Sequence, residues 1–272
     1  MITSSSNKRI KEVIKLQQKA KARREWDVFV VEGTKMFLEA DTQRIKDVYV
    51  SETALQNLSK ECRQKLEEIS ASYEVVTDDI FSRLSDTQTP QGILCVIEQY
   101  HYTLDDLFDK NSTGKNLPAD KVPLILVLED IQDPGNLGTI LRTGEGAGVS
   151  GIIMSSHTVD IYNPKTIRST MGSIYRMPFL YTDKLADTIE KLKEHKMTVY
   201  AAHLQGQTDY DRCDYLTGSA FLIGNEANGL KEETAALADR LIRIPMHGRV
   251  ESLNAAVASS ILIYEAARQR RM

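Results

Sequence analysis

Short apolar runs alternate with helical stretches through the second half of this 272-residue sequence. The runs are apolar enough to be strands that are buried on both faces. Such strands belong to parallel sheets, because a crossover helix must carry the chain back between parallel neighbours and so covers the sheet. The sequence therefore predicts a parallel α/β domain, with strands at 123–128, 151–154, 198–201, 220–223 and 240–244 and helices at 138–145, 163–170, 184–195, 231–238 and 253–270.

The first hundred residues predict a smaller α/β unit. Its strands are expected at 29–31, 47–50, 73–76 and 92–97, and its helices at 33–40, 53–70 and 78–84. A cluster of loop-forming residues at 111–118 then marks a linker. We predict a first domain at 1–105, a linker at 106–120 and a second domain at 121–272.

Composition excludes several classes of protein. No apolar run approaches the roughly 20 residues that a membrane helix needs, and the N-terminus lacks the apolar stretch of a secretory signal. Three cysteines, odd in number and far apart, suit reduced thiols and predict a cytoplasmic protein. The five histidines show no pair at zinc-ligand spacing, so no metal is expected.

Positive charge is concentrated at the N-terminus. Residues 1–24 carry eight lysines and arginines against one acid, Glu12, although the whole chain has a net charge of −4. Such a block favours a local contact with a polyanion, but it is equally typical of a solvated helix face. Ile10, Val13, Ile14 and Leu16 form an apolar stripe within it, which predicts a helix.

Three polar loops follow predicted strands of the second domain. They are Asp130–Gly138, Gly224–Gly229 and Ile244–Asn254, and the last leads into a helix for which Ser252 is a natural N-cap. Each loop alone is explained by turn chemistry. Three of them at the carboxyl edge of one parallel sheet favour a ligand site. A GxGxxG at 146–151 follows a helix and precedes a strand, the wrong order for a dinucleotide site.

These loops carry the patterns N-L-G-x-I-x-R-T from Asn136, G-x-E-x-x-G-L from Gly224 and I-P-M-x-G-x-x-x-S-L-N from Ile244. In residues, order and spacing they resemble the three motifs of the SpoU (TrmH-like) RNA ribose methyltransferases of the SPOUT superfamily. The match covers about 121–272. Residues 1–105 more weakly resemble the ribosomal-protein-like RNA-binding domain that often precedes this catalytic domain.

The resemblance implies a catalytic domain with a deep trefoil knot, S-adenosyl-L-methionine as cofactor and a homodimer. It implies main-chain cofactor contacts from Gly224, Ile244 and Leu253, with Leu204, Asn225 and Met246 as further neighbours. Arg142 matches the catalytic arginine, and the other catalytic-site positions are Asn136, Glu226, Ser252 and Asn254. A guanidinium has a pKa above about 12 and is a poor base, so we expect Arg142 to act as a clamp on an RNA phosphate.

The expected reaction is 2′-O-methylation of RNA, with ribosomal RNA as the expected substrate. Methylation of tRNA or of a base by the same fold, and a non-catalytic RNA-binding role, stay open. The basic block would then be a flexible helix that binds RNA phosphates. Trp26, Tyr49 and Tyr73 could stack on bases, although core packing is the commoner fate of such side chains. The RNA-binding candidates are Lys8, Arg9, Lys15, Lys19, Arg23 and Arg24.

Overall fold

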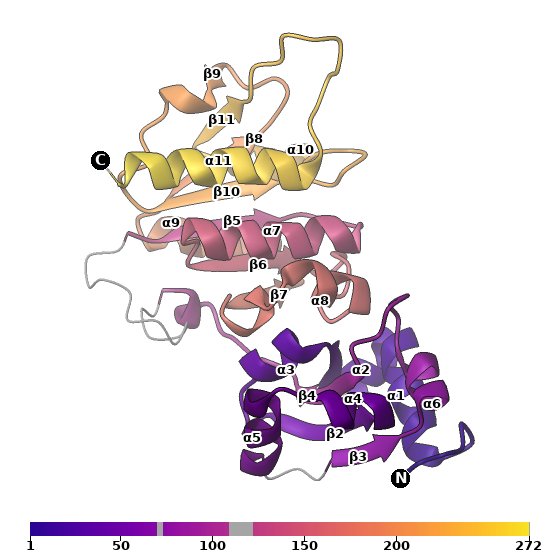
Figure 1. Ribbon diagram of the computed structural model, residues 1–272. Coiled ribbons are helices and arrows are strands. Elements are labelled where there is room, and N and C mark those ends of the chain that lie inside the picture. The colour runs from indigo at the N-terminus through magenta and orange to yellow at the C-terminus, as the bar shows by residue number, and fades with distance from the viewer. Residues whose placement is uncertain (70–72, 109–121, 272) are drawn as a thin grey trace. The chain divides into compact units, whose positions relative to one another are not determined.

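A computed structural model describes residues 1–69, 73–108 and 122–271. Two compact units divide the chain (Figure 1). Unit 1 consists of Met1–Tyr100 and Asp160–Tyr175, and unit 2 of His101–Val159 and Arg176–Met272. Of the predicted linker at 106–120, all but residues 106–108 lie outside the described residues. No helix in the described ranges is long and apolar enough to cross a membrane.

Unit 1 contains a four-stranded sheet in the order β1-β4-β2-β3. β4 (Ile93–Glu98) is antiparallel to both β1 (Val28–Glu32) and β2 (Ile45–Ser51), whereas β3 (Tyr73–Val76) is parallel to β2. The helices from the first hundred residues are α1 (Lys8–Gln18), α2 (Ala20–Trp26), α3 (Thr34–Glu39), α4 (Glu52–Asn57), α5 (Lys60–Glu68) and α6 (Asp78–Leu84). The predicted helix at 53–70 is two helices, because Ser59 is extended and caps α5 by accepting a hydrogen bond from the Cys62 N–H.

The basic N-terminal helix packs into the core of unit 1. Ile10, Val13 and Leu16 of α1 are buried, and they cluster with Tyr49 and Leu94 of the sheet. The predicted stripe is therefore confirmed, but α1 is a fixed element of the domain and not a flexible arm. Removal of residues 1–24 would open this core, so the RNA contacts of α1 have to be tested with single substitutions.

Residues 160–175 lie between two strands of unit 2 in the chain but pack within unit 1. They contain α8 (Pro164–Thr170) and a short 3-10 turn, η2 (Ser173–Tyr175). Ile161, Ile167 and Ile174 are buried, and the Tyr162 ring lies 4.6 Å from that of Phe29. The sequence assigns this segment to the second domain, since nothing in its local pattern indicates a contact made more than a hundred residues away.

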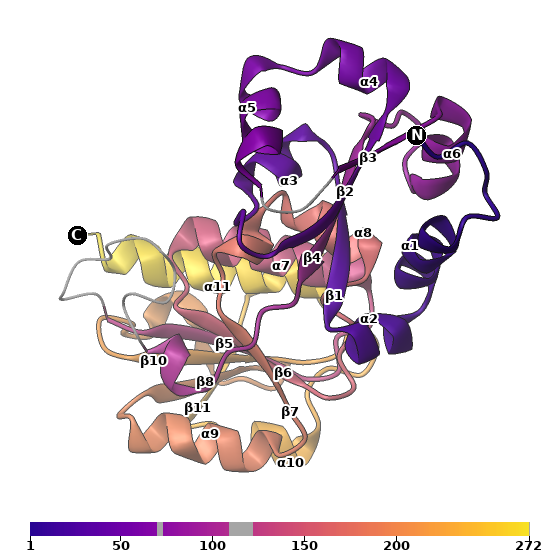
Figure 2. The same cartoon turned by 90° about the horizontal axis from the view of Figure 1, so that it is seen from below.

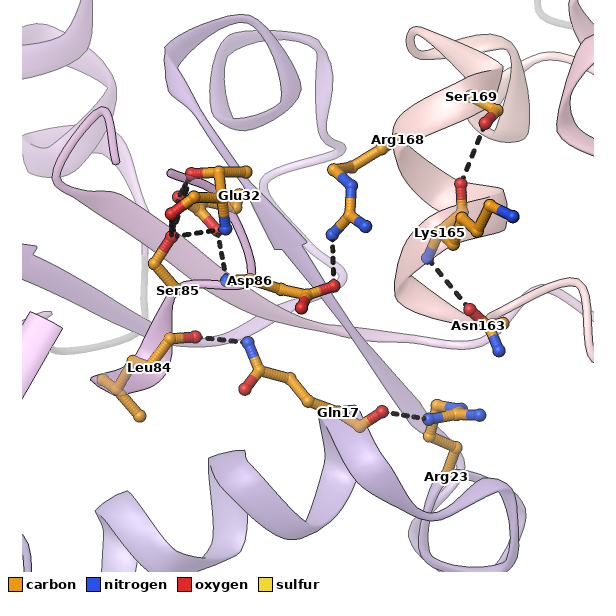
Figure 3. A network of polar contacts seen from close by, with 11 residues as sticks. Gln17, Arg23, Glu32, Leu84, Ser85, Asp86, Asn163, Lys165, Arg168 and Ser169 are labelled. Atoms are coloured by element: carbon orange, nitrogen blue, oxygen red, sulfur yellow. Dashed lines mark hydrogen bonds and ion pairs between the residues drawn. The ribbon is translucent and has the colours of Figure 1, made fainter. Parts of the chain in front are cut away.

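Arg23 links residues 160–175 to the N-terminal helices through hydrogen bonds. Its side chain is 3% exposed, and Nε and Nη2 donate to Oδ2 of Asp160 at 2.8 and 2.6 Å. Nη1 donates to the carbonyl oxygens of Leu16 and Gln17 at 2.6 and 3.0 Å. Figure 3 shows Arg23 beside Gln17. The prediction that Arg23 contacts RNA is therefore wrong for this geometry, because its charge is buried against a carboxylate.

We expect Arg23→Ala to destabilise unit 1 by about 3 kcal/mol, since removal of one partner leaves the other charge poorly compensated. Arg24→Ala is the matched control: Arg24 is exposed, has no ion pair among the described residues, and should cost no more than about 0.5 kcal/mol. Urea unfolding of both variants measures the difference. Equal effects would show that the buried pair contributes nothing.

Arg168 provides a second, exposed link from α8. It donates to Asp86 at 2.5 Å, and Figure 3 shows the two side chains facing each other. The loop that carries Asp86 is also held by Glu32, whose carboxylate accepts hydrogen bonds from the hydroxyls of Ser85 and Thr87 at 2.7 and 3.0 Å. Both partners of the Arg168 pair are solvent-exposed, so this pair contributes at most about 1 kcal/mol.

Unit 2 contains a seven-stranded sheet in the order β7-β6-β5-β10-β8-β11-β9, with every pairing parallel. α7 and α11 cover one face and α9 and α10 the other (Figure 2). The predicted α/β fold is confirmed. The elements are η1 (Asp105–Leu107), β5 (Leu124–Leu128), α7 (Pro134–Ala147), β6 (Gly151–Ser155), β7 (Phe179–Thr182), α9 (Leu185–Glu194), β8 (Thr198–Ala202), β9 (Thr208–Asp209), η3 (Tyr210–Arg212), β10 (Ser219–Ile223), α10 (Glu232–Ala235), β11 (Arg240–Arg243) and α11 (Ala255–Gln269).

The sequence analysis did not predict the two outer strands of this sheet, β7 and β9. β7 is an edge strand with only Phe179 fully buried, so it lacks a continuous apolar run. β9 has two residues and lies beyond β11, so that the connection from β8 to β9 crosses β11. Gly206 lies at the crossing: a Cβ on it would come within 2.5 Å of the Ile242 carbonyl carbon. Only glycine fits between the crossing segments.

Candidate active site

Three loops at the carboxyl edge of the sheet of unit 2 form the candidate site. They follow β5, β10 and β11, and two of them lead into α7 and α11. Parallel strands end at a common edge, which is where open α/β sheets bind ligands. The sequence predicted these loops, and the structure shows how their side chains are joined.

Asn136, Glu226 and Asn254 form one hydrogen-bonded chain across the three loops. Asn136 Nδ2 donates to Glu226 Oε1 at 2.9 Å, and Asn254 Nδ2 donates to Asn136 Oδ1 at 2.9 Å. Glu226 also accepts hydrogen bonds from the backbone N–H groups of Gln132 and Asp133, at 3.0 and 3.1 Å. Three residues far apart in the sequence thus hold the loops in one arrangement.

The helices that begin at this site are capped by residues of the loops. α11 begins at Ala255, and Asn254 is its N-cap, with Oδ1 accepting from the N–H groups of Ala256 and Val257. The prediction that Ser252 caps this helix is therefore wrong. Ser252 is exposed, and its side chain makes no hydrogen bond with a described residue.

α7 begins four residues earlier than predicted, at Pro134 and not at Gly138. Asp133 caps it by accepting a hydrogen bond from the Asn136 N–H at 2.8 Å. Proline at the first helical position is favoured because its missing N–H would have no partner there. The Pro-Gly pair, which is typical of a turn, is therefore the first turn of a helix.

The Gly224–Gly229 loop closes tightly on itself. Asn225 and Gly229 exchange backbone hydrogen bonds at 3.0 and 2.9 Å, and a Cβ on Gly224 would lie 2.1 Å from the Gly229 carbonyl carbon. The Asn225 side chain is used within the protein: its amide donates to the Asp130 carbonyl at 2.7 Å and accepts from Ala227 and Asn228. Its predicted contact with a cofactor stays a prediction.

A buried carboxylate, which the sequence prediction missed, supports this loop. Glu129 is 3% exposed and accepts hydrogen bonds from the Lys231 N–H at 2.8 Å and the Thr234 hydroxyl at 2.6 Å. The Lys231 ammonium lies 2.9 Å from Asp130 Oδ2. The available signal was an acid directly after an apolar strand, a position where a charge is buried only with partners.

The remaining predicted residues lie in the third loop, after β8 and on α7. Ile244, Met246 and Leu253 are half-buried on the segment between β11 and α11, and Leu204 is 67% exposed on the crossing segment after β8. Arg142 is exposed on α7 and forms no hydrogen bond or ion pair with any described residue. Its charge is therefore available to a ligand. No group of three or more potential metal ligands occurs among the described residues.

Glu226 is held in its ionised form. Partial burial acts to raise the pKa of its carboxyl, but hydrogen bonds from the Asn136 side chain and from the Gln132 and Asp133 backbone outweigh it and lower the pKa. A carboxylate that already accepts these bonds is a weak proton acceptor. Its geometry fits a connector between loops.

We expect Glu226→Gln to lower the free energy of unfolding of unit 2 by about 1 kcal/mol at pH 7, since an amide NH₂ replaces an accepting oxygen. Because the folded pKa is depressed, the contribution of Glu226 is complete above its unfolded pKa of about 4.3 and is lost as pH falls through the folded value. The difference between wild type and variant should therefore shrink below about pH 4. A difference independent of pH from 3 to 7 would contradict this account.

Comparisons with known proteins agree on one family. Residues 123–264 match the SpoU rRNA Methylase family, and residues 7–95 match the MRM3-like substrate binding domain. The chain is 30% identical over 263 residues to the 23S rRNA (guanosine(2553)-2'-O)-methyltransferase RlmP of Bacillus subtilis (strain 168), covering 97% of each chain.

Two solved structures are similar over nearly the whole chain. The SpoU methyltransferase AviRb from Streptomyces viridochromogenes, in complex with the cofactor AdoMet, is 25% identical with a TM-score of 0.85, covering 97% of this chain and 98% of that one. An AdoMet-bound rRNA methyltransferase from Sinorhizobium meliloti is 32% identical with a TM-score of 0.82, covering 98% and 97%. With its three motifs joined at one sheet edge, this chain belongs to the SpoU rRNA methylase family.

Proposed function

We propose that the protein transfers a methyl group from S-adenosyl-L-methionine to the 2′-hydroxyl of a nucleotide in ribosomal RNA. The observation that carries this proposal is the chain of hydrogen bonds from Asn254 through Asn136 to Glu226, which joins the three family motifs into one site. The relatives support the chemistry, since one is named as a 23S rRNA 2'-O-methyltransferase and two were solved with AdoMet. A ribosomal RNA substrate also agrees with the predicted cytoplasmic location.

The loops fit a cofactor that is held largely by main-chain groups. The backbone at Gly224 approaches its neighbours more closely than any side chain would allow. Half-buried Ile244, Met246 and Leu253 offer apolar surface in the third loop, and Leu204 adds an exposed apolar side chain. We assign these residues to cofactor binding. The sulfonium of the bound cofactor supplies the reactive methyl group, so the protein has to position the acceptor and exclude water.

Arg142 is assigned to the RNA. Its guanidinium lacks a protein partner among the described residues and can bind a phosphate beside the target ribose through two parallel hydrogen bonds. The same positive charge lowers the cost of negative charge that develops on the 2′-oxygen as its proton leaves. Glu226 and Asn136 position the loops, and exposed Ser252 is free to contact the substrate.

We further propose that the protein is a homodimer built on α7 and α11. These helices pack side by side, with Tyr264 of α11 near Gly146 of α7. Val257 and Tyr264 expose 48% and 47% of their surface on a helix whose opposite side is buried. A second copy would cover this apolar surface and bring Arg142 to a subunit interface. Sedimentation of Val257→Asp should then show the monomer.

The trefoil knot that the family resemblance implies is also a proposal. It is supported by the position of β11 between β8 and β9, with the connecting segment packed against the β11 backbone at Gly206. The knot would form if the segment that leads into α11 threads through the loop of residues 203–218. Such threading is rare in proteins and is not predictable from hydropathy.

The decisive experiment combines calorimetry with mapping of the modified nucleotide. We expect S-adenosyl-L-methionine to bind, and labelled methyl groups to appear in ribosomal RNA at a position that resists alkaline hydrolysis, since alkaline cleavage requires a free 2′-hydroxyl. Label found on a base, or only in tRNA, would show that the proposed acceptor is wrong. Absence of cofactor binding would leave a non-catalytic RNA-binding protein.

A further inference from the structure

Trp26, the only tryptophan in the chain, is 39% exposed at the end of α2. Aromatic rings of this size are usually packed inside, as Tyr49 is at 2% exposure. The Lys15 ammonium lies over the indole, 4.9 Å from the ring centroid. An exposed indole beside a cation therefore stands on the surface of the domain that matches a substrate binding domain.

A row of lysines leads to this ring. Lys8, Lys11 and Lys15 lie on the solvent-facing side of α1, opposite the buried Ile10, Val13 and Leu16, and Lys19 follows at its C-cap. Lys8 pairs with Glu12, but Lys11, Lys15 and Lys19 have no carboxylate partner among the described residues. At 1.5 Å per residue, Lys8 and Lys15 are roughly 10 Å apart along the axis. The row therefore offers several cations along one line to the phosphates of a single strand.

We propose that the α1 lysine row and Trp26 form a binding site for single-stranded RNA, in which an unpaired base stacks on the indole and the lysines bind the adjoining phosphates. Stacking is open to every base because every base has a π-face, and phosphate contacts add affinity without sequence information. The site would hold an unpaired stretch near the target nucleotide. The inference rests on the proposed function only in taking RNA as the partner.

The fluorescence of Trp26 can be used to detect a base stacked on its ring. Titration of the full chain with a single-stranded decauridylate should quench the tryptophan fluorescence, and a hairpin of paired bases should not. Affinity is measured separately by anisotropy of the labelled oligonucleotide. We expect Trp26→Ala to weaken binding about tenfold and Trp26→Phe, which keeps a ring, to weaken it much less. If Trp26→Ala lowers the melting temperature, Trp26→Leu should be used in its place. Leucine keeps the apolar packing but cannot stack on a base.

Salt dependence separates the two kinds of contact. Each lost phosphate contact lowers the slope of log K against log salt concentration by about 0.7 for a single strand. Lys11→Ala and Lys15→Ala should each do so, whereas Trp26→Ala should leave the slope unchanged. Tyr73→Ala is the matched control, because Tyr73 is also an exposed aromatic residue of unit 1, with 42% of its surface accessible. Its neighbour Glu74 faces α1, where it pairs with Arg9. Adjacent residues of a strand point to opposite faces, so Tyr73 points away from α1.

The outcomes are distinct. RNA binding without quenching, or with equal effects of Trp26→Ala and Tyr73→Ala, would overturn the stacking site while leaving the proposed methylation intact. Calorimetry with S-adenosyl-L-methionine should be unaffected by every variant of α1 and Trp26. Loss of cofactor binding in the wild type would count against the proposed function and not against this site.

Discussion

Replacement of Arg142 by alanine is expected to lower the rate of methyl transfer at least about 100-fold while leaving the affinity for S-adenosyl-L-methionine almost unchanged. Removal of one preorganised group that stabilises developing charge typically costs this much in rate. Arg142 has no partner among the described residues, so its loss leaves no buried charge uncompensated and should not destabilise unit 2. Single-turnover transfer to RNA and calorimetry with the cofactor measure the two quantities.

Thr139→Ala is the matched control for this variant. Thr139 is exposed on the same side of α7, one turn before Arg142, and its substitution should change neither the rate nor the affinity by more than about twofold. Arg142→Lys should recover only part of the rate, because an ammonium lacks the paired donors of a guanidinium. A fall in cofactor affinity as large as the fall in rate would assign Arg142 to the cofactor.

Gly224→Ala is expected to weaken binding of S-adenosyl-L-methionine more than about tenfold, because the added methyl group has no room. Its Cβ would lie 2.1 Å from both the Gly229 carbonyl carbon and the Leu230 nitrogen, which are backbone atoms that cannot rotate away. The loop must therefore open, and overpacking of this kind costs about 1–3 kcal/mol. Calorimetry with the cofactor measures the loss.

Gly248→Ala provides the control in the third loop. A Cβ on Gly248 meets no atom within 4 Å, so this substitution should leave cofactor affinity close to that of the wild type. Far-UV circular dichroism of Gly224→Ala tells a local rearrangement from unfolding of unit 2. Unchanged affinity in a folded Gly224→Ala protein would remove this loop from the cofactor site.

The sequence predicted helices and strands correctly wherever the hydropathy pattern of one short segment was sufficient. The strands at 123–128 and 220–223 are apolar throughout, and their positions follow from burial on both faces of a parallel sheet. The α1 stripe was readable for the same reason, since Ile10, Val13 and Leu16 recur at helical spacing. Helix ends were less accurate, because competing caps such as Ser252 and Asn254 differ only in their tertiary partners.

Whether a single charged or aromatic residue is buried or exposed depends on contacts with segments that are remote in the sequence. Arg23 and Arg24 are neighbours in one basic block, yet one is buried against Asp160 and the other is exposed. Likewise Trp26 lies at the surface whereas Tyr49 is in the core. Sequence spacing gives the face of a helix on which a residue lies, but it does not say what a distant segment brings to that face.

The sequence by itself determined the two α/β units, the three motif loops and the family, because hydropathy period and motif spacing are properties of short segments. Only the tertiary structure decided that Asn136, Glu226 and Asn254 share one hydrogen-bonded chain, that residues 160–175 pack in unit 1, and that β11 lies between β8 and β9. These are contacts between segments that are remote in the chain, and such contacts are fixed by packing and not by local propensity.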